Sequence, residues 1–343
     1  MTSMSVQPVP TIRAAHLSPY IEFLQDKGFP IERALEGSNL PTTVADHPES
    51  HIPLMSSLQF LSILQKSQGL REIGFLSGNL ICLELLARST LQMLLSAPTL
   101  NAALNTFFRY IGEESSVLEG WTCGEGETAS VCINHRISVD DEEMRAMHIH
   151  FMLLLLALIR VFAGPSWKPH VVGLQCRLPL SPLVGHYFPN TRFVCGQSHS
   201  WIGFPAEMLG SERLWGNCHR LRRPVLQTTA IASEQSQSDF AGSLKRVLKS
   251  YLSDGYPSIE LAATISGTSI RTLQRNLSQC GLTYSKIVDC ARVEAAMVLL
   301  RDPNIKIIEI AYAVGYEDPS HFSRAFRRMA GTSPREYRLR SAA

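Results

Sequence analysis

The chain has 343 residues, of which 45% are hydrophobic and 18% are charged, the ordinary balance of a soluble globular protein. This composition excludes a collagen-like, coiled-coil or mainly disordered chain, and the length predicts two domains. The formal net charge is +2, but residues 236–343 hold 15 Lys+Arg and 10 Asp+Glu, against 17 and 20 in the rest. The basic last third indicates an anionic partner, the alternative being a basic surface without one.

The cysteines and the most apolar stretch indicate a cytoplasmic protein. The eight cysteines are scattered, and no two have CxxC spacing. Residues 1–11 show no basic start followed by an apolar run, so we expect no secretory signal and reduced thiols. Residues 149–159 are apolar but fewer than the about 20 residues needed to span a bilayer, so we expect a buried helix and no membrane partner.

Helical patterns dominate the chain up to about residue 110, after a start at 1–15 that we expect to be flexible. Apolar residues recur at helical spacing over 19–35, 56–68 and 91–110. Pro98 interrupts the third segment. Thr99 can cap the piece that follows, because its side chain can accept a hydrogen bond from a free backbone N–H.

Strand patterns begin after residue 115. The alternation from 129 to 133 follows two glycines and predicts a hairpin within 115–136. A long helix is expected over 140–162 and further strands over 171–178 and 192–194. Residues 16–221 are therefore predicted to form a mixed α+β domain, and the polar segment 222–238 a linker.

Two segments near the C-terminus have the spacing of helix-turn-helix units. In the first, Ser258 and Ser269 can cap helices over 259–265 and 270–279, with Gly267 in the turn. In the second, helices over 307–314 and from about 318 to 329 flank Gly315. Glycine permits the positive φ of a tight turn and lets the two helices approach closely.

The second segment resembles the C-terminal signature of AraC/XylS-type transcription regulators over Ile308–Arg328 and Gly331–Arg338. Ser269–Arg275 resembles the first recognition helix of that family. The resemblance implies an all-α DNA-binding domain over 239–340, in which a long helix, here about 284–300, joins two helix-turn-helix units. Ser266 and Leu261 depart from the family pattern, so we expect the first unit to be packed less typically.

The N-terminal part resembles the arabinose-binding-like sensor domain of one branch of this family. The similar features are Ile52-Pro-Leu, Gly69-Leu with Gly74-Phe, Thr99-Leu, and Trp167-Lys-Pro ahead of an expected strand. The expected fold class is therefore an α+β sensor and dimerisation domain followed by an all-α domain with two helix-turn-helix units. The resemblance implies a small-molecule effector without naming it.

A recognition helix fits the major groove of DNA, and its side chains at i, i+3 and i+4 share the outward face. From this spacing and the resemblance, we expect DNA contacts from one face of the second helix of each unit, and phosphate contacts from Arg327 and Arg328 at the end of the second recognition helix. The alternative for each residue is a solvated helix face. The expected DNA-binding residues are Arg271, Thr272, Gln274, Arg275, Ser320, His321, Ser323, Arg324, Arg327 and Arg328.

Other kinds of site have weaker support. His148 and His150 are two residues apart, so on a helix they point in different directions and cannot form an i, i+4 metal pair. Cys218-His219 lacks partners at zinc-binding spacing. The sequence contains no recognisable catalytic frame, so we expect no enzyme, no cofactor and no metal site.

The leading hypothesis is a transcription activator that reads two successive major grooves of double-stranded DNA and responds to an effector. The family resemblance favours contact with RNA polymerase, and a homodimer is expected. The alternative is a ligand-independent dimeric regulator whose N-terminal domain only oligomerises. An enzyme fused to a DNA-binding module is disfavoured by the missing catalytic frame.

Overall fold

The computed structural model describes residues 7–70, 72–177, 180–182, 184–213 and 239–341, so the expected linker over 222–238 lies outside the described residues. The chain divides into two compact units that do not follow chain order. The sheet unit comprises Ala15–Ser38 and Ser57–Ser233. The C-terminal unit comprises Met1–Ala14, Asn39–Ser56 and Glu234–Ala343. Two N-terminal segments therefore group with the C-terminal helices.

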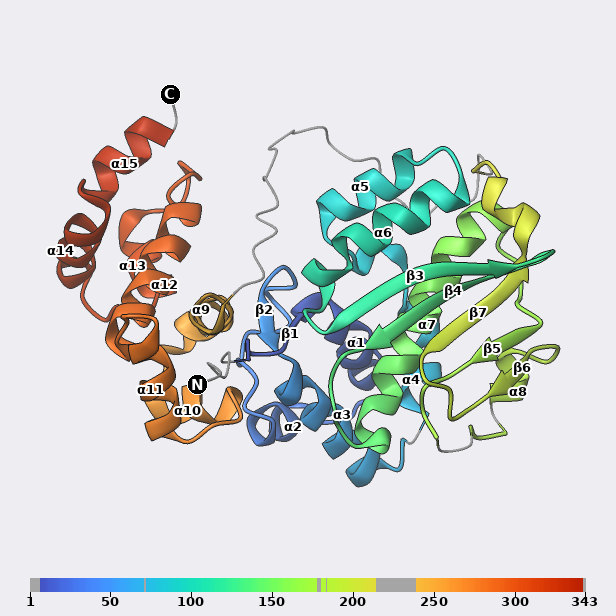
Figure 1. Cartoon of the computed structure of the whole chain (residues 1–343). Coiled ribbons are helices and arrows are strands. Elements are labelled where there is room, and N and C mark those ends of the chain that lie inside the picture. The colour runs from blue at the N-terminus through green and yellow to red at the C-terminus, as the bar shows by residue number, and fades with distance from the viewer. Residues whose placement is uncertain (1–6, 71, 178–179, 183, 214–238, 342–343) are drawn as a thin grey trace, which may run out of the picture. The chain divides into compact units, whose positions relative to one another are not determined.

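The sheet unit contains a five-stranded sheet with the order β3-β4-β7-β5-β6 (Figure 1). Neighbouring strands in this sheet pair antiparallel, except that β5 and β6 pair parallel. The predicted hairpin and the strand at 192–194 are confirmed, whereas the strand predicted over 171–178 ends at Gly173 and β7 was not predicted. The strands are β3 (Leu118–Glu125), β4 (Thr128–His135), β5 (Val171–Gly173), β6 (Arg192–Val194) and β7 (Ser200–Pro205).

The predicted helical segments of the sheet unit are confirmed except for the first, and the structure adds two short helices, Ile73–Leu76 and Val184–Tyr187, that were not predicted. The expected helix over 19–35 is two helices, because Gly28 adopts φ 70° and interrupts the helical pattern of backbone hydrogen bonds. Thr99 caps the helix after Pro98 as predicted, accepting a hydrogen bond from the Ala102 N–H. The helices, including α3 at the boundary between the units, are α1 (Ser18–Asp26), α2 (Glu32–Gly37), α3 (Leu54–Gln68), α4 (Ile73–Leu76), α5 (Arg88–Ser96), α6 (Leu100–Glu114), α7 (Asp141–Ala163) and α8 (Val184–Tyr187).

Helix α7 is the central apolar helix of the sheet unit. Its segment Glu143–Ala163 is long and apolar enough to cross a membrane by length and composition, so the expectation that the stretch is too short is wrong. The helix continues beyond the apolar run at 149–159. Within the structure 78% of its most apolar window is buried, and the helix contacts β7, α4 and α6. The predicted buried helix is therefore confirmed.

The C-terminal unit contains the expected helices together with a small N-terminal sheet. Strands β1 (Thr11–Arg13) and β2 (His51–Pro53) pair antiparallel. A 3₁₀ helix over Lys249–Asp254 follows the first helix. The α-helices are α9 (Phe240–Leu248), α10 (Ile259–Ile265), α11 (Ile270–Gln279), α12 (Tyr284–Leu299), α13 (Ile307–Ala313), α14 (Pro319–Ala330) and α15 (Pro334–Ser341).

Two apolar cores share helix α12. Its first half supplies Ile287 and Val288 to a core that also contains α9, α10 and α11. Its second half supplies Ala296 to a core formed with α13 and α14, where Phe322 and Phe326 are almost fully buried. Burial of a large apolar side chain stabilises by about 1.5–3 kcal/mol. The shared helix therefore holds α11 and α14 in one packed body.

The N-terminal segments of this unit are hydrogen-bonded to its first helices. The Val9 N–H donates to Ser243 Oγ at 2.9 Å, and the Tyr251 hydroxyl donates to the carbonyl of Asn39 at 2.6 Å. The backbone N–H of Thr42 donates to Asp254 Oδ2 at 3.1 Å. These residues are far apart in the sequence, which explains why local patterns gave no sign of the grouping.

Candidate nucleic-acid interface

The first helix-turn-helix unit has the predicted caps and turn. Ser258 accepts from the Leu261 N–H and Ser269 accepts from the Thr272 N–H, so each side chain satisfies a free donor at a helix start. Gly267 has φ 63° in the turn. Ser266 and Leu261, the departures from the family pattern, are accommodated. The Ser266 hydroxyl donates to the Ala262 carbonyl at 2.6 Å, and Leu261 packs partly buried on the first core.

Helix α11 has one buried and one exposed face. Leu273 and Leu277 are fully buried, which turns Arg271, Gln274 and Arg275 to the exposed face. Thr272 is half-buried and its hydroxyl accepts from Ser269 Oγ at 3.0 Å, so it belongs to the capping network. Contact of these side chains with DNA remains a prediction.

Helix α14 is built in the same way. Asp318 accepts a hydrogen bond from the Ser320 N–H at 2.7 Å, Pro319 occupies the first turn, and Gly331 with φ 72° ends the helix. The hydrogen bond from the Ser320 N–H lowers the pKa of the Asp318 carboxyl, and the side chains of Ser320 and His321 contribute less. The Asp318 carboxylate therefore stays ionised, and its negative charge interacts favourably with the positive N-terminal end of the helix dipole.

Burial of Phe322 and Phe326 exposes the opposite face of α14. The Ser323 hydroxyl donates to the Pro319 carbonyl at 3.0 Å and is half-buried, so it is the member of the predicted set least free for DNA. The exposed members are Ser320, His321, Arg324, Arg327 and Arg328.

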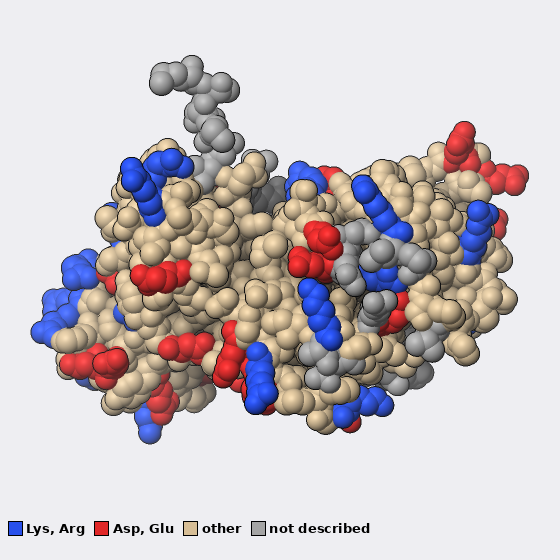
Figure 2. Space-filling view, turned by 90° about the horizontal axis from the view of Figure 1, so that it is seen from below, with Lys and Arg blue, Asp and Glu red and all other residues tan. Residues whose placement is uncertain are grey.

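Two of the exposed nitrogen-bearing side chains on α14 lie near carboxylates. Arg328 Nη2 lies 3.4 Å from Asp289 Oδ2 of α12, and His321 Nε2 lies 3.8 Å from Asp318 Oδ2. Asp289 is half-buried and the other three side chains are exposed, and surface pairs of this kind contribute little to stability. Figure 2 shows Lys and Arg side chains along the outer edge of the helical part, with Asp and Glu among them. On the face shown, acidic side chains therefore interrupt the basic ones.

A buried arginine that the sequence did not predict links the two helix-turn-helix units. The guanidinium of Arg292 on α12 lies 4.9 Å from the ring centroid of Tyr256 and 4.4 Å from that of Tyr316. It also donates to the carbonyl of Gly315 in the second turn. Cation–π contacts of desolvated guanidinium groups are worth about 2 kcal/mol. Arg292 therefore ties the second turn to the loop before α10.

Neighbouring ion pairs also fix α12. Lys245 of α9 and Lys249, the first residue of the following 3₁₀ helix, lie 2.5 and 2.6 Å from the carboxylate oxygens of Glu294. Partial burial raises the pKa of Glu294, but hydrogen bonds and charge from the two lysines outweigh it, so the pKa is lowered overall. These contacts attach α12 to α9.

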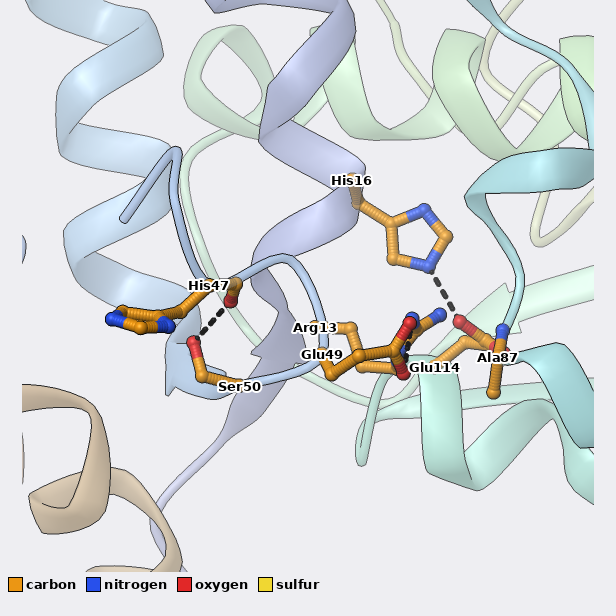
Figure 3. A network of polar contacts seen from close by, with 7 residues as sticks. All are labelled: Arg13, His16, His47, Glu49, Ser50, Ala87 and Glu114. Atoms are coloured by element: carbon orange, nitrogen blue, oxygen red, sulfur yellow. Dashed lines mark hydrogen bonds and ion pairs between the residues drawn. The ribbon is translucent and has the colours of Figure 1, made fainter. Parts of the chain in front are cut away.

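Polar groups are also buried in the sheet unit. His16 Nε2 lies 3.0 Å from Glu114 Oε2, whose other carboxylate oxygen accepts from the Ala87 N–H at 2.8 Å (Figure 3). The His16 Nδ1 lies 2.9 Å from Nε2 of His150 on α7. Figure 3 also shows, in the C-terminal unit, the ion pair of Arg13 with Glu49 at 2.9 Å.

His150 and His135 are buried and electrically neutral. Burial, followed by the charge of neighbouring imidazoles, lowers the pKa of both well below the ordinary value. His148 lies beside His135, with ring centroids 4.8 Å apart. Among the described residues no cluster of three or more His, Cys, Asp or Glu is arranged to hold a metal ion. Cys218 and His219 lie outside the described residues.

A hollow of about 430 Å³ lies in the sheet unit beside β6 and α8. Phe188 and Phe193 supply aromatic rings, and Arg177 supplies a cation. This volume falls within the range of about 300–1,000 Å³ that is typical of small-molecule sites. The hollow therefore has room for a small ligand, with aromatic, hydroxyl and cationic groups on its lining.

Comparison with known proteins matches two successive regions of the chain to two families. The family described as "Arabinose-binding domain of AraC transcription regulator, N-term" matches residues 28–212, and a helix-turn-helix domain family matches residues 262–340. The ornithine utilization regulator of Pseudomonas aeruginosa is 32% identical over 200 residues, which cover 53% of this chain and 59% of the relative. The transcriptional activator RhaS of Escherichia coli is 33% identical over 187 residues, covering 52% and 67%.

Among solved structures, the transcriptional regulator CdpR of Pseudomonas aeruginosa aligns over 95% of this chain and 98% of its own, with 20% identity and a TM-score of 0.43. The chain spans little more than half the length of the ornithine utilization regulator. The arabinose-binding family covers more than half of this chain and ends before the residues matched by the helix-turn-helix family. The chain therefore belongs to the AraC-type transcription regulators that carry an N-terminal arabinose-binding domain.

Proposed function

We propose that this protein is an effector-responsive transcription activator that inserts α11 and α14 into two successive major grooves of double-stranded DNA. The observation that carries the proposal is the pair of capped helices on one packed body, each with an exposed basic face. Successive major grooves on one side of B-DNA are about 34 Å apart. One protomer then reads a bipartite site that need not be palindromic.

The residues on the two faces have chemistry suited to base edges. The guanidinium groups of Arg271 and Arg275 can donate two hydrogen bonds to guanine, and the Gln274 amide can pair with adenine. On α14, His321 and Arg324 take the corresponding outward positions. Each good bidentate contact discriminates against the wrong base by about 1–3 kcal/mol.

The remaining members of the predicted set are proposed to contact the DNA backbone. Arg327 and Arg328 supply phosphate contacts, whose contribution depends on salt and not on base sequence. Thr272 and Ser320 lie near the helix starts, where hydroxyl groups can donate to phosphate oxygens. A phosphate contact from Ser323 requires its hydroxyl to leave the Pro319 carbonyl.

The test is selection of bound fragments from a randomised double-stranded DNA pool, using the full-length protein at several salt concentrations. Arg275→Ala and Arg324→Ala are run beside the wild type. Arg301→Ala is the matched control, because it removes one exposed positive charge outside both recognition helices.

The expected result is a site with two half-sites about one helical turn apart. Arg275→Ala is expected to relax base preference in one half, Arg324→Ala in the other, and Arg301→Ala in neither. Binding without any enriched sequence contradicts base reading by α11 and α14. Relaxation of the same half by both variants contradicts the assignment of one helix to each groove.

The sheet unit is proposed to bind the effector, and its hollow beside Phe188 and Phe193 is the first place to look. The arabinose-binding family match and the ornithine utilization regulator support a small polar metabolite as the effector class. An effector regulates only if it binds one conformational or oligomeric state better than the other. We infer that the protein acts as a homodimer with RNA polymerase in the cytoplasm, and without catalysing a reaction.

The alternative is a ligand-independent dimer. Thermal unfolding in the presence of a panel of sugars and amino acids, ornithine included, separates the two functions. A raised melting temperature together with stimulated transcription in vitro by purified RNA polymerase supports the effector. Constitutive stimulation that no compound changes favours the ligand-independent regulator, and sedimentation measures the dimer in either case.

A further inference from the structure

Two cysteine side chains meet on neighbouring strands of the sheet unit. The Sγ atoms of Cys123 on β3 and Cys132 on β4 lie 3.5 Å apart, and both cysteines are free thiols. In the strand register Trp121 is opposite Cys132, and Cys123 is two residues further along β3. Side chains two residues apart on a strand share a face, so the two thiols are diagonal neighbours on the same face of the sheet.

The two thiols differ in their accessibility. Cys123 is exposed, whereas Cys132 is only 1% exposed. Cys132 lies between Trp121 on one neighbouring strand and Trp201 on the other. Burial, followed by the neighbouring Cys123 thiol, raises the pKa of Cys132 to about 12. Cys132 therefore keeps its proton at neutral pH, and an oxidant dissolved in water reaches Cys123 first.

We propose that Cys123 and Cys132 are a reversible redox pair that a peroxide-class oxidant converts into a disulfide. The Cys123 thiolate attacks one peroxide oxygen, the O–O bond breaks, and the leaving hydroxide takes up a proton to become water. Cys132 sulfur then attacks the Cys123 sulfenic acid, the S–O bond breaks, the S–S bond forms, and the hydroxyl leaves as water with the Cys132 proton. The two sulfurs together lose two electrons, and a dithiol reductant restores them.

Disulfide formation requires the backbone to move as well as the sulfurs, because diagonal Cα atoms on neighbouring strands are about 7–8 Å apart and disulfide-linked Cα atoms are about 4.4–6.8 Å apart. A disulfide bond is about 2.0 Å long, so the sulfurs must approach by about 1.5 Å. Cys123 lies close to the hairpin turn, where Gly124 and Gly126 are flexible positions, and Gly126 adopts φ 61°. Cys280 provides a comparator on the same chain, because it is also exposed but makes no sulfur–sulfur contact with the described residues.

The test treats the full-length protein with graded hydrogen peroxide and then alkylates the remaining thiols. Trypsin releases both cysteines in one peptide, 110–136, because no Lys or Arg lies between Arg109 and Arg136. Glutamyl endopeptidase cuts between them at Glu125 and Glu127, so the two halves stay joined only if the disulfide has formed. The variants are Cys123→Ser, Cys132→Ser and Cys132→Ala, with Cys280→Ser as the matched control.

The expected result is that peptide 110–136 loses two hydrogen atoms and both alkylation sites, and that dithiothreitol restores them. Tryptophan fluorescence is expected to fall and recover in parallel, because Trp121 and Trp201 flank Cys132. Cys280→Ser should behave as the wild type, and either Cys132 variant should leave Cys123 as a sulfenic acid that dimedone traps. The proposal is overturned if peroxide oxidises Cys280 while both thiols in 110–136 stay free, or if Cys123 proceeds to sulfinic acid with Cys132 still alkylatable.

Discussion

The turn glycines of the two helix-turn-helix units have equivalent positions but unequal surroundings. Gly267 has φ 63° and a Cβ added there would meet no atom within 4 Å. Gly315 has φ 78°, and a Cβ would lie 2.7 Å from the Leu252 carbonyl oxygen and 2.8 Å from that of Gly255. Alanine at position 267 therefore tests only the cost of the positive φ, whereas alanine at position 315 tests that cost together with steric overlap.

The expected loss of stability differs between the two variants. The left-handed conformation costs a non-glycine residue about 1–2 kcal/mol, and the reduced freedom of the unfolded chain returns about 0.4–1 kcal/mol. Gly267→Ala is therefore expected to cost about 1 kcal/mol. Gly315→Ala adds overpacking of about 1–3 kcal/mol against two backbone carbonyls, which cannot move as a side-chain tip can. We expect a total of about 2–4 kcal/mol for Gly315→Ala.

The assay is amide hydrogen exchange of the full-length variants, followed by mass spectrometry of peptides from α10–α11 and from α13–α14. The tryptophans stand at 121, 167, 201 and 215, so their fluorescence does not report on 239–343. Protection in α13 is expected to fall about 30-fold or more for Gly315→Ala, and protection in α10 about fivefold for Gly267→Ala, at roughly 1.4 kcal/mol per factor of ten. Equal losses at the two turns would refute the steric argument.

Three further predictions concern charge. Burial lowers the pKa of His135 and His150 in the folded protein, whereas in the unfolded chain both histidines take up protons below about pH 6.5. The free energy of unfolding should therefore fall as the pH decreases, by up to about 1.4 kcal/mol per pH unit for each histidine. Urea unfolding between pH 7.5 and 5.5 measures this change, and a free energy that does not vary with pH contradicts it. Arg292→Lys should destabilise α13 and α14 by about 1–2 kcal/mol, because an ammonium cannot stack between two tyrosine rings as a planar guanidinium does, and hydrogen exchange that matches the wild type contradicts the stacking. Arg327→Ala should reduce the slope of log affinity against log salt by about one without altering the selected sequence, and a changed sequence makes Arg327 a base contact.

The helix-turn-helix units could be predicted from the sequence because their signals are local. The Ser258 and Ser269 caps, the turn glycines and the helical spacing of the apolar residues all act within a few residues, and the structure places α10 and α11 where they indicate. The burial of Leu273 and Phe322 follows from the same spacing, so the exposed faces of α11 and α14 could also be predicted.

Other features depend on segments that meet only in the folded chain. The Arg292 stack joins α12 to two tyrosines from separate loops, and the thiol pair depends on the register of β3 and β4. Short strands such as β1 and β2 have too few residues for a periodic signal, and the grouping of residues 39–56 with the C-terminal helices arises from contacts of high sequence separation. Local sequence patterns thus specify which helices form and which of their faces are apolar. Which distant side chains meet depends on the folded chain, because strand pairing and burial require neighbours that local patterns do not specify.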